Sequence, residues 1–508
     1  MRGLRWPGRA AARPMSGHPP HSLQALQARH GPRLRWLLLM TVMIGTMASV
    51  MSSTIMNVAI PDMSRHFTLG QSRVQWVSSG FMVAMMVSML TTPWLLARYG
   101  YRRTYGLCMG MLLAGGVVGG VANDYPLVLL ARVVEGMAAG AVQPIPAIII
   151  LRAFDAHEQG RASAVFGTGV VLGPAIGPSI GGLLVDLFGW RSIFFMVVPL
   201  CLLGLWLSRR YVPDSAPGGV PAQSDSPAID TLGMLLVALS TLALLNGMVQ
   251  WQAGNTWPTL ALLGGAGLGM LGFVAWQQHL LQRWQAGRRR PLMNLKVFGQ
   301  RNFSMGSLVA LTYGMALFGS TYLLPVYMQV GLGLSPSYIG AALLPAGLLL
   351  SVTIALVGRM ADRTPTHRLV TVGLLLLALS FALMPTVHPA RGLALLWAWV
   401  ILGRIGLGFV LPSLNLSAMK GMPPPLIPQG ASTFNFMRML GGAVGVGLCA
   451  VVLDWRLQAA GVPSLWQVQA GDPLALRAFH EAFAMLAGLT ALSVLAALQL
   501  APRASRAA

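Results

Sequence analysis

Arg132 and Glu135 place opposite charges three residues apart in an apolar stretch that reads Leu-Leu-Ala-Arg-Val-Val-Glu-Gly-Met-Ala. On a helix, residues at i and i+3 share one face, so this guanidinium and this carboxylate can meet. Burying a charge in hydrocarbon costs at least about 2.5–3.5 kcal/mol. Hydrocarbon favours the neutral carboxyl, whereas Arg132 favours the carboxylate. We therefore expect the pair either to load and release a proton, or to help its helix pack as a permanent ion pair.

The composition indicates which elements position this pair. The 508 residues are 55% hydrophobic and 9% charged, with a mean hydropathy of +0.65, whereas soluble domains carry roughly 25% charged residues. Apolar runs of about 20 residues separated by short polar loops are typical of a polytopic α-helical membrane protein. The period-two alternation of a membrane β-barrel is not seen. The net charge of +22 fits basic loops at a membrane better than nucleic-acid binding.

Fourteen apolar segments are long enough to span. They lie near 36–58, 76–97, 104–122, 127–151, 161–185, 192–208, 231–250, 258–279, 303–329, 337–358, 368–386, 394–416, 429–453 and 481–500. With the N-terminus inside, the cytoplasmic side holds 26 of the 35 Lys and Arg residues and the outer side holds six. The other three, Arg132, Arg404 and Arg438, lie within helices. The positive-inside rule therefore places both termini in the cytoplasm of a multi-pass protein, expected in the cell (inner) membrane.

The two ends of the chain repeat weakly. Arg132-x-x-x-Gly136 corresponds to Arg404-x-x-x-Gly408, and parallel repeats of six spans build alternating-access transporters. We expect an all-α fold of two six-helix bundles, at 36–210 and 302–500, with two inserted helices within a linker at 211–301. Residues 1–35 are expected to form a disordered basic cytoplasmic tail, and 501–508 a second cytoplasmic tail.

A motif in the fifth segment carries a family resemblance. Its glycines and prolines are Gly173, Pro174, Gly177, Pro178, Gly181 and Gly182. This string resembles the antiporter motif of the major facilitator superfamily, and the resemblance continues at 54–61, 190–194, 322–329 and 435–442. With fourteen spans, the chain resembles the EmrB/QacA-type drug:proton antiporter branch. The resemblance implies a major facilitator fold and proton-coupled efflux of hydrophobic or amphipathic molecules by alternating access, as in multidrug and antibiotic resistance.

Two positions depart from that branch. Its members normally carry an Asp in the loop after the second segment, where this chain has Ala97. The resemblance implies a cytoplasmic gate in the two equivalent loops, formed here by Arg98, Arg102, Arg103, Asp362 and Arg363. The branch also usually has an Asp in the first segment, where this chain reads Met51-Ser52-Ser53-Thr54.

Of the thirteen acidic residues, only Glu135 lies well inside a predicted span. At 1.5 Å per residue, Glu135 lies roughly 16 Å below Asp124, and Ser52 roughly 13 Å below Pro61. The two positions are therefore at similar depth on neighbouring segments. We hypothesise that Glu135, beside Arg132, has taken over proton coupling from the missing acid of the first segment.

Candidate substrate contacts are apolar or polar side chains on segments that border the cavity in this family. They are Met47, Met51, Ser52, Asn57, Gln143, Tyr313, Tyr322 and Arg404. Methionine suits varied apolar cargo, although a methionine stripe is more often packing or lipid contact. The tyrosines could stack on substrate or belong to an interfacial belt. The excess of buried arginine favours anionic or neutral cargo over dications.

The sequence lacks the residues that several other classes of function require. The three cysteines have no paired spacing, the nine histidines lie at ends or loops, and no phosphate-binding Gly-x-x-x-x-Gly-Lys motif occurs. We expect no metal and no cofactor besides the coupling proton. The remaining alternatives are an exporter of one dedicated metabolite, a transporter that has lost proton coupling, or an intramembrane enzyme, for which no nucleophile or His–acid pair is found at membrane depth. Expected partners are small-molecule substrates and lipids, with a periplasmic adaptor and an outer-membrane channel as further candidates, and no nucleic acid.

Overall fold

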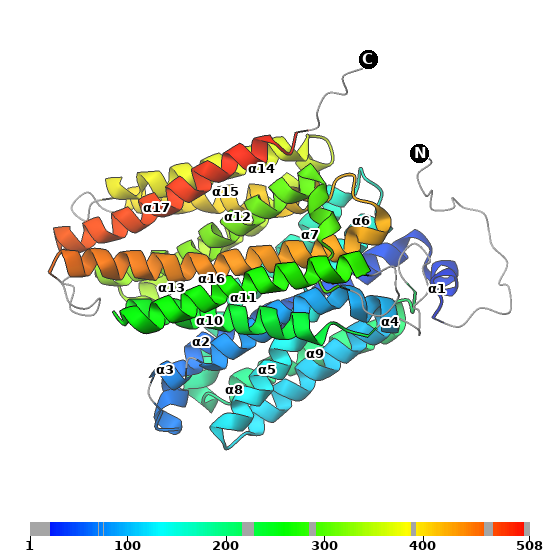
Figure 1. Ribbon diagram of the computed structural model, residues 1–508, viewed down its shortest axis with the longest axis horizontal. Helices are drawn as coiled ribbons and strands as arrows, with labels where there is room; N and C mark the ends of the chain where they lie inside the picture. The colour runs from blue at the N-terminus through cyan, green and yellow to red at the C-terminus, as the bar shows by residue number, and fades with distance from the viewer. Residues whose placement is uncertain are drawn as a thin grey trace, which may run out of the picture.

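The computed structural model describes residues 21–501, apart from 70, 75, 216–227, 284–290, 388–392 and 462–470. The side chains at 57, 71–72, 172, 174–176, 178–179, 336–337 and 342 also lie outside the description. Within the described part, the chain folds into helices and no strand (Figure 1). Twelve of these helices are long and apolar enough to cross a membrane. The prediction of an all-α polytopic membrane protein is therefore confirmed.

The N-terminal bundle contains the first nine helices. They are α1 (Leu23–His30), α2 (Leu34–His66), α3 (Gln71–Val74), α4 (Trp76–Val121), α5 (Tyr125–Val142), α6 (Ile145–Ala153), α7 (Gln159–Phe188), α8 (Ser192–Met196) and α9 (Val198–Tyr211). Residues 23–30, predicted to belong to a disordered tail, instead form α1, which leads into α2. Helix α4 joins the predicted second and third segments across a kink at Gly100, whose φ of 77° and ψ of 178° are readily adopted only by glycine.

The predicted fourth segment divides into α5 and α6 at Gln143–Pro144. Pro144 has no backbone N–H to donate to an i−4 carbonyl, and Pro146 stands in the first turn of α6, where that loss costs little. The break lies at the point where the N-terminal bundle meets α16 (Ile427–Ala459), so the side chain of Gln143 is held at the boundary between the two bundles.

The inserted pair is α10 (Thr231–Gln252) and α11 (Thr256–Arg283). The C-terminal bundle contains α12 (Arg301–Val326), α13 (Pro336–Ala361), α14 (Thr366–Leu383), α15 (Ala394–Ala418), α16 (Ile427–Ala459) and α17 (Pro473–Leu498). The outward side chains of these helices are large and apolar. Leu268 on α11 is 73% exposed and Trp257 is 79% exposed. Such surfaces are costly in water and suit contact with lipid.

The two bundles meet at the end of the molecule that carries both termini, here called the termini end, and they diverge toward the opposite end (Figure 1). At the termini end, α7 crosses α13 so closely that a Cβ on Gly160 would lie 2.4 Å from the Gly358 carbonyl oxygen. The Arg152 guanidinium donates to the Pro424 carbonyl at 2.7 Å. Between the described residues of the two bundles, no hydrogen bond or ion pair is found toward the opposite end. The polar contacts seen between the described residues of the two bundles therefore lie toward the termini end and the middle of the molecule.

Candidate functional site

Arg132, Glu135 and Ser52 form a buried polar cluster, here called the N-bundle cluster, and each is only 1% exposed. The Arg132 Nη1 atom lies 2.5 Å from Glu135 Oε2 and donates to Ser52 Oγ at 2.8 Å. The Ser52 hydroxyl in turn donates to Glu135 Oε2 at 3.2 Å, and Arg132 Nη2 donates to the Ser52 carbonyl at 3.2 Å. Helices α2 and α5 therefore meet through these three residues, as their predicted depths indicated.

The packing around the cluster leaves one carboxylate oxygen without a protein partner. Glu135 Oε1 and Arg132 Nε are buried and make no hydrogen bond to any described residue. Glycines on α4 provide the space, since a Cβ on Gly115 would lie 2.5 Å from Glu135 Cγ and a Cβ on Gly116 would lie 3.6 Å from Oε1. The Phe81 ring covers the guanidinium at 4.1 Å, a cation–π contact. A proton can thus add to Oε1 without breaking a hydrogen bond.

Close approach of α5 to α4 holds the cluster in place. A Cβ on Gly136 would lie 2.4 Å from the Phe81 carbonyl oxygen, and a Cβ on Gly140 would lie 2.0 Å from that of Met85. This four-residue glycine spacing is the usual means by which membrane helices bring their backbones together. The Phe81 ring and Glu135 are therefore positioned by one tight helix pair.

The methionine candidates on α2 pack against glycines of α7. A Cβ on Gly173 would lie 3.1 Å from Met51 Cγ and 3.5 Å from the Met47 carbonyl oxygen. The next motif glycines continue along α2, with Gly177 opposite Thr54 and Gly181 opposite Ile55, whereas nothing lies within 4 Å of a Cβ on Gly182. The motif thus joins two helices of the same bundle. The side chains of Asn57, Pro174 and Pro178 lie outside the described residues.

A second polar group, here called the C-bundle arginine site, consists of Tyr313, Arg404, Asn435 and Arg438. Arg438 Nη2 donates to Asn435 Oδ1 at 3.0 Å and reaches Gln143 Oε1 of the other bundle at 3.5 Å. The buried Tyr313 lies where α12 meets both helices that carry the arginines, since its hydroxyl lies 3.4 Å from the Leu407 carbonyl oxygen and a Cβ on the neighbouring Gly314 would lie 2.0 Å from the Arg438 carbonyl oxygen. Three of the predicted residues, Gln143, Tyr313 and Arg404, are therefore grouped here. Tyr322 is not among them, because it lies farther along α12, where it interacts electrostatically with Asp454.

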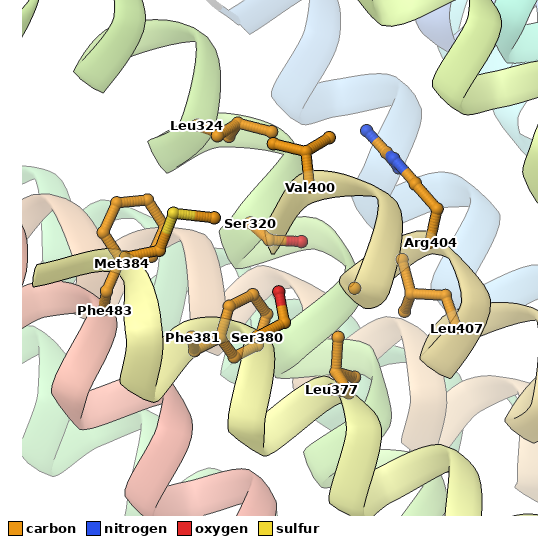
Figure 2. A pocket seen from close by; sticks show the side chains of 11 residues that line it. Ser320, Leu324, Leu377, Ser380, Phe381, Met384, Val400, Arg404, Leu407 and Phe483 are labelled. Carbon is orange, nitrogen blue, oxygen red and sulfur yellow. The ribbon is translucent and has the colours of Figure 1, made fainter. Parts of the chain in front are cut away.

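Arg404 lines a small cavity of about 20 Å³ between α12, α14, α15 and α17. Figure 2 shows its side chain beside Val400 and the hydroxyls of Ser320 and Ser380 in the same lining. The remaining lining residues are mostly apolar: Leu324, Leu377, Phe381, Met384, Val400, Gly403, Leu407 and Phe483. A volume of this size accommodates about one water molecule. The cavity is therefore too small for an organic cargo in this conformation.

Two basic residues of the predicted gate loops contact side chains within their own bundle or the segment that follows it, and two are exposed. Arg98 lies over the Trp94 ring at 5.5 Å and the Tyr99 ring at 5.8 Å. Arg102 lies 3.9 Å from Asp214. Arg103 and Arg363 are exposed. Neither the ring contacts of Arg98 nor the contact between Arg102 and Asp214 joins the two bundles.

Asp362 joins the two bundles instead. Its carboxylate accepts hydrogen bonds from the backbone N–H groups of Gly160 at 2.7 Å and Arg161 at 3.1 Å, in the first turn of α7. These donors have no partner within their own helix, and a carboxylate also suits the positive end of a helix dipole. Burial raises the pKa of Asp362 above its ordinary value, against the two backbone donors and nearby His157, which lower it.

This raised pKa predicts that acidification favours closure of the termini end. When the bundles separate, Asp362 becomes exposed and its pKa returns toward the ordinary value, so the closed form binds the proton more tightly. The closed population should therefore rise as the pH falls toward the raised pKa. Spin labels on cysteines at Arg103 and Lys420, both exposed, would report the distance between the bundles. Asp362→Asn, which does not titrate, should flatten this dependence, and an unchanged pH profile in that variant would contradict the prediction.

Sequence reasoning missed several residues that shape these sites. Phe81, Gly115, Gly116 and Asn435 carry no charge, and each is one apolar or small residue among many in its span. The adjacent pair Gly115–Gly116 was the one feature of the sequence that could have indicated this site. Paired glycines in a membrane helix allow a neighbouring group to approach closely. Here that neighbour is the Glu135 side chain.

Two helical bundles that contain the N-bundle cluster and the C-bundle arginine site fit a multi-pass membrane transporter. The chain belongs to the Major Facilitator Superfamily, whose family profile matches residues 42–446. It is 30% identical over 433 residues to the uncharacterized MFS-type transporter Rv1250 of Mycobacterium tuberculosis, covering 84% of this chain and 71% of that protein. It is 29% identical to the multidrug resistance protein B homolog of the same organism, covering 88% and 80%. The human organic anion transporter MFSD10 (TETRAN) shares the fold with a TM-score of 0.62 at 16% identity, covering 91% and 99%.

These similarities confirm the superfamily and the fold. They also confirm that the protein is a transporter and not an enzyme, which removes the intramembrane enzyme from the alternatives.

Proposed function

We propose that the protein is a proton-coupled antiporter that exports hydrophobic or amphipathic small molecules, of the EmrB/QacA-type drug:proton branch. The observation that carries the proposal is the N-bundle cluster. It contains a carboxylate at membrane depth, joined to an arginine on one oxygen and left without a described partner on the other. The similarity to a protein named for multidrug resistance supports the export of drugs.

The proposed cycle uses the two oxygens of Glu135 differently. A proton arriving from the outer side adds to Oε1 and neutralises the carboxylate, while Oε2 stays hydrogen-bonded to Ser52 and Arg132. The guanidinium then loses its counter-charge but keeps the Ser52 carbonyl and the face of Phe81. An uncompensated buried cation is unfavourable, so protonation biases the bundles toward the alternative state. In that alternative state the proton leaves to the cytoplasm, and the substrate then binds for the next half of the cycle.

We propose fourteen spans for this fold. Besides the twelve apolar helices, Gly100 divides α4 into two segments, and α7 has 30 residues, enough to cross a membrane. The excess of Lys and Arg in loops near the termini end supports a cytoplasmic location for that end and for both termini. The membrane is then the cell (inner) membrane, and the opposite end is available to a periplasmic adaptor leading to an outer-membrane channel.

Proton flux in proteoliposomes tests the exchange directly. We expect an outward-directed gradient of a transported drug to drive protons in the opposite direction, reported by a pH-sensitive dye trapped in the lumen. An imposed proton gradient should likewise accumulate drug against its own gradient, because coupling works in both directions. Drug transport that neither moves protons nor responds to a proton gradient would contradict antiport. Liposomes with no protein provide the leak rate to subtract.

A further inference from the structure

We propose that the C-bundle arginine site binds anions, and that the cargo of this transporter carries a negatively charged group, such as a carboxylate or a sulfonate, on an apolar body. The inference deepens the proposed function by naming the substrate class, and it rests on that function only in placing the substrate path between the two bundles.

Among the residues that the structure describes, no carboxylate balances the positive charge of this site. The described ion pairs all involve other residues, and no described carboxylate lies within ion-pair distance of Arg404 or Arg438. Arg132 in the other bundle shows the contrast, since it is paired with Glu135, Ser52 and Phe81. Both side chains are half-buried on helices that are long and apolar enough to span a membrane, where a guanidinium group without a counter-charge is costly. Residues retained at such a cost usually serve a ligand or an ion.

The geometry brings the helices that carry both arginines to one place. Arg404 is on α15 and Arg438 on α16, and both helices meet α12 at Tyr313. The Tyr313 hydroxyl lies 3.4 Å from the Leu407 carbonyl oxygen of α15, and a Cβ on the neighbouring Gly314 would lie 2.0 Å from the Arg438 carbonyl oxygen of α16. The partners of Arg438 are neutral amides, and its Nε is buried without a hydrogen bond to any described residue. For Arg404 no hydrogen bond is found among the described residues either. Several N–H donors therefore remain for an acceptor that carries negative charge, which is the acceptor guanidinium binds best.

The surroundings select an amphipathic anion over an inorganic one. The cavity beside Arg404 is lined mainly by apolar side chains, including Leu324, Val400 and Phe381, with two serine hydroxyls (Figure 2). Binding pockets for small organic molecules combine such apolar walls with a few polar groups that fix orientation. Because Gln143 of the N-terminal bundle also contacts Arg438, an anion bound here would lie at the boundary of the two bundles.

Two dansyl probes of the same fluorophore test the sign of the preferred charge. Dansylglycine carries a carboxylate, and dansylcadaverine carries an ammonium group. We expect the purified wild-type protein in detergent to bind dansylglycine at least about tenfold more tightly, and Arg404→Gln or Arg438→Gln to weaken that binding about tenfold or more. Neither variant should weaken dansylcadaverine binding. Arg456→Gln, outside the site, is the matched control and should change neither affinity.

The outcomes separate this inference from the proposed function. Equal affinity of the wild type for both probes, or unchanged dansylglycine binding in both glutamine variants, overturns the anion site, and the first result requires no variant to fold. Arg404→Lys and Arg438→Lys keep the charge and should retain much of the binding. The assay has no membrane and no gradient. Anion binding that persists in a protein without drug-driven proton flux therefore leaves this inference standing while antiport fails.

Discussion

Replacing Glu135 with glutamine is expected to abolish proton-driven efflux. Glutamine has nearly the same shape and can still accept a hydrogen bond from Arg132, but it cannot exchange a proton. Positioned proton-transfer groups contribute about 10²–10⁴-fold in enzymes, and we expect gradient-driven transport to fall by at least the lower of these factors. The measurement is drug uptake into inverted membrane vesicles energised by a proton gradient, compared with wild type at equal protein content. Undiminished transport in Glu135→Gln would reduce the ion pair to a packing role.

A rescue variant separates coupling from folding. Glu135→Gln leaves Arg132 without its counter-charge, and breaking a buried pair in this way can cost about 3–5 kcal/mol. Size-exclusion profiles must therefore show that the variant remains folded. Ser52 lies 2.8 Å from Arg132, so Ser52→Asp combined with Glu135→Gln returns a carboxylate to the guanidinium from α2. We expect this double variant to recover part of the coupled transport. Recovery would show that a carboxylate beside Arg132 is required, on either helix.

Replacing Gly140 with leucine is expected to prevent α4 and α5 from pairing. A Cβ at this position would lie 2.0 Å from the Met85 carbonyl oxygen and 2.8 Å from its carbon. Those atoms are backbone, so no side-chain rotation can relieve the clash, and we expect a loss of about 3 kcal/mol or more. The fraction of protein that remains monodisperse after heating in detergent measures the loss. Because Gly140 lies on the helix that carries Glu135, transport should fall as well.

Gly110 on α4 provides the matched control for this substitution. It is also a helical glycine, but nothing lies within 4 Å of a Cβ added there. Gly110→Leu adds the same side chain and should leave heat resistance and transport near the wild-type values. A Gly140→Leu variant as resistant as Gly110→Leu would contradict the close approach of α4 to α5.

The sequence by itself determined the membrane class, the approximate positions of the helices and the similar depth of Ser52 and Glu135. Each of these follows from local physics. A span requires about 20 apolar residues, and a constant rise of 1.5 Å per residue gives the depth of any side chain once the ends of its helix are known. The i, i+3 spacing alone brought Arg132 to Glu135.

The tertiary structure determined which residues each helix face contacts. The sequence left both a cavity and packing open for the methionines of α2, with packing or lipid contact the more frequent case, and Met43, Met47 and Met51 lie against glycines of α7. Asp362 was expected to act in a charged gate, yet its partners are backbone N–H groups at the start of α7. No residue type in the sequence indicates such donors, because they are available only where a helix begins beside another chain segment.

The same difference between local and tertiary contacts distinguishes Arg132 from the other two arginines. Arg132 has its partner three residues away, so the sequence contains the whole pair. Arg404 and Arg438 are 34 positions apart, and only the packing of α12, α15 and α16 brings the helices that carry them together at Tyr313. Local spacing therefore predicted the N-bundle cluster, whereas the C-bundle arginine site exists only because the bundle folds.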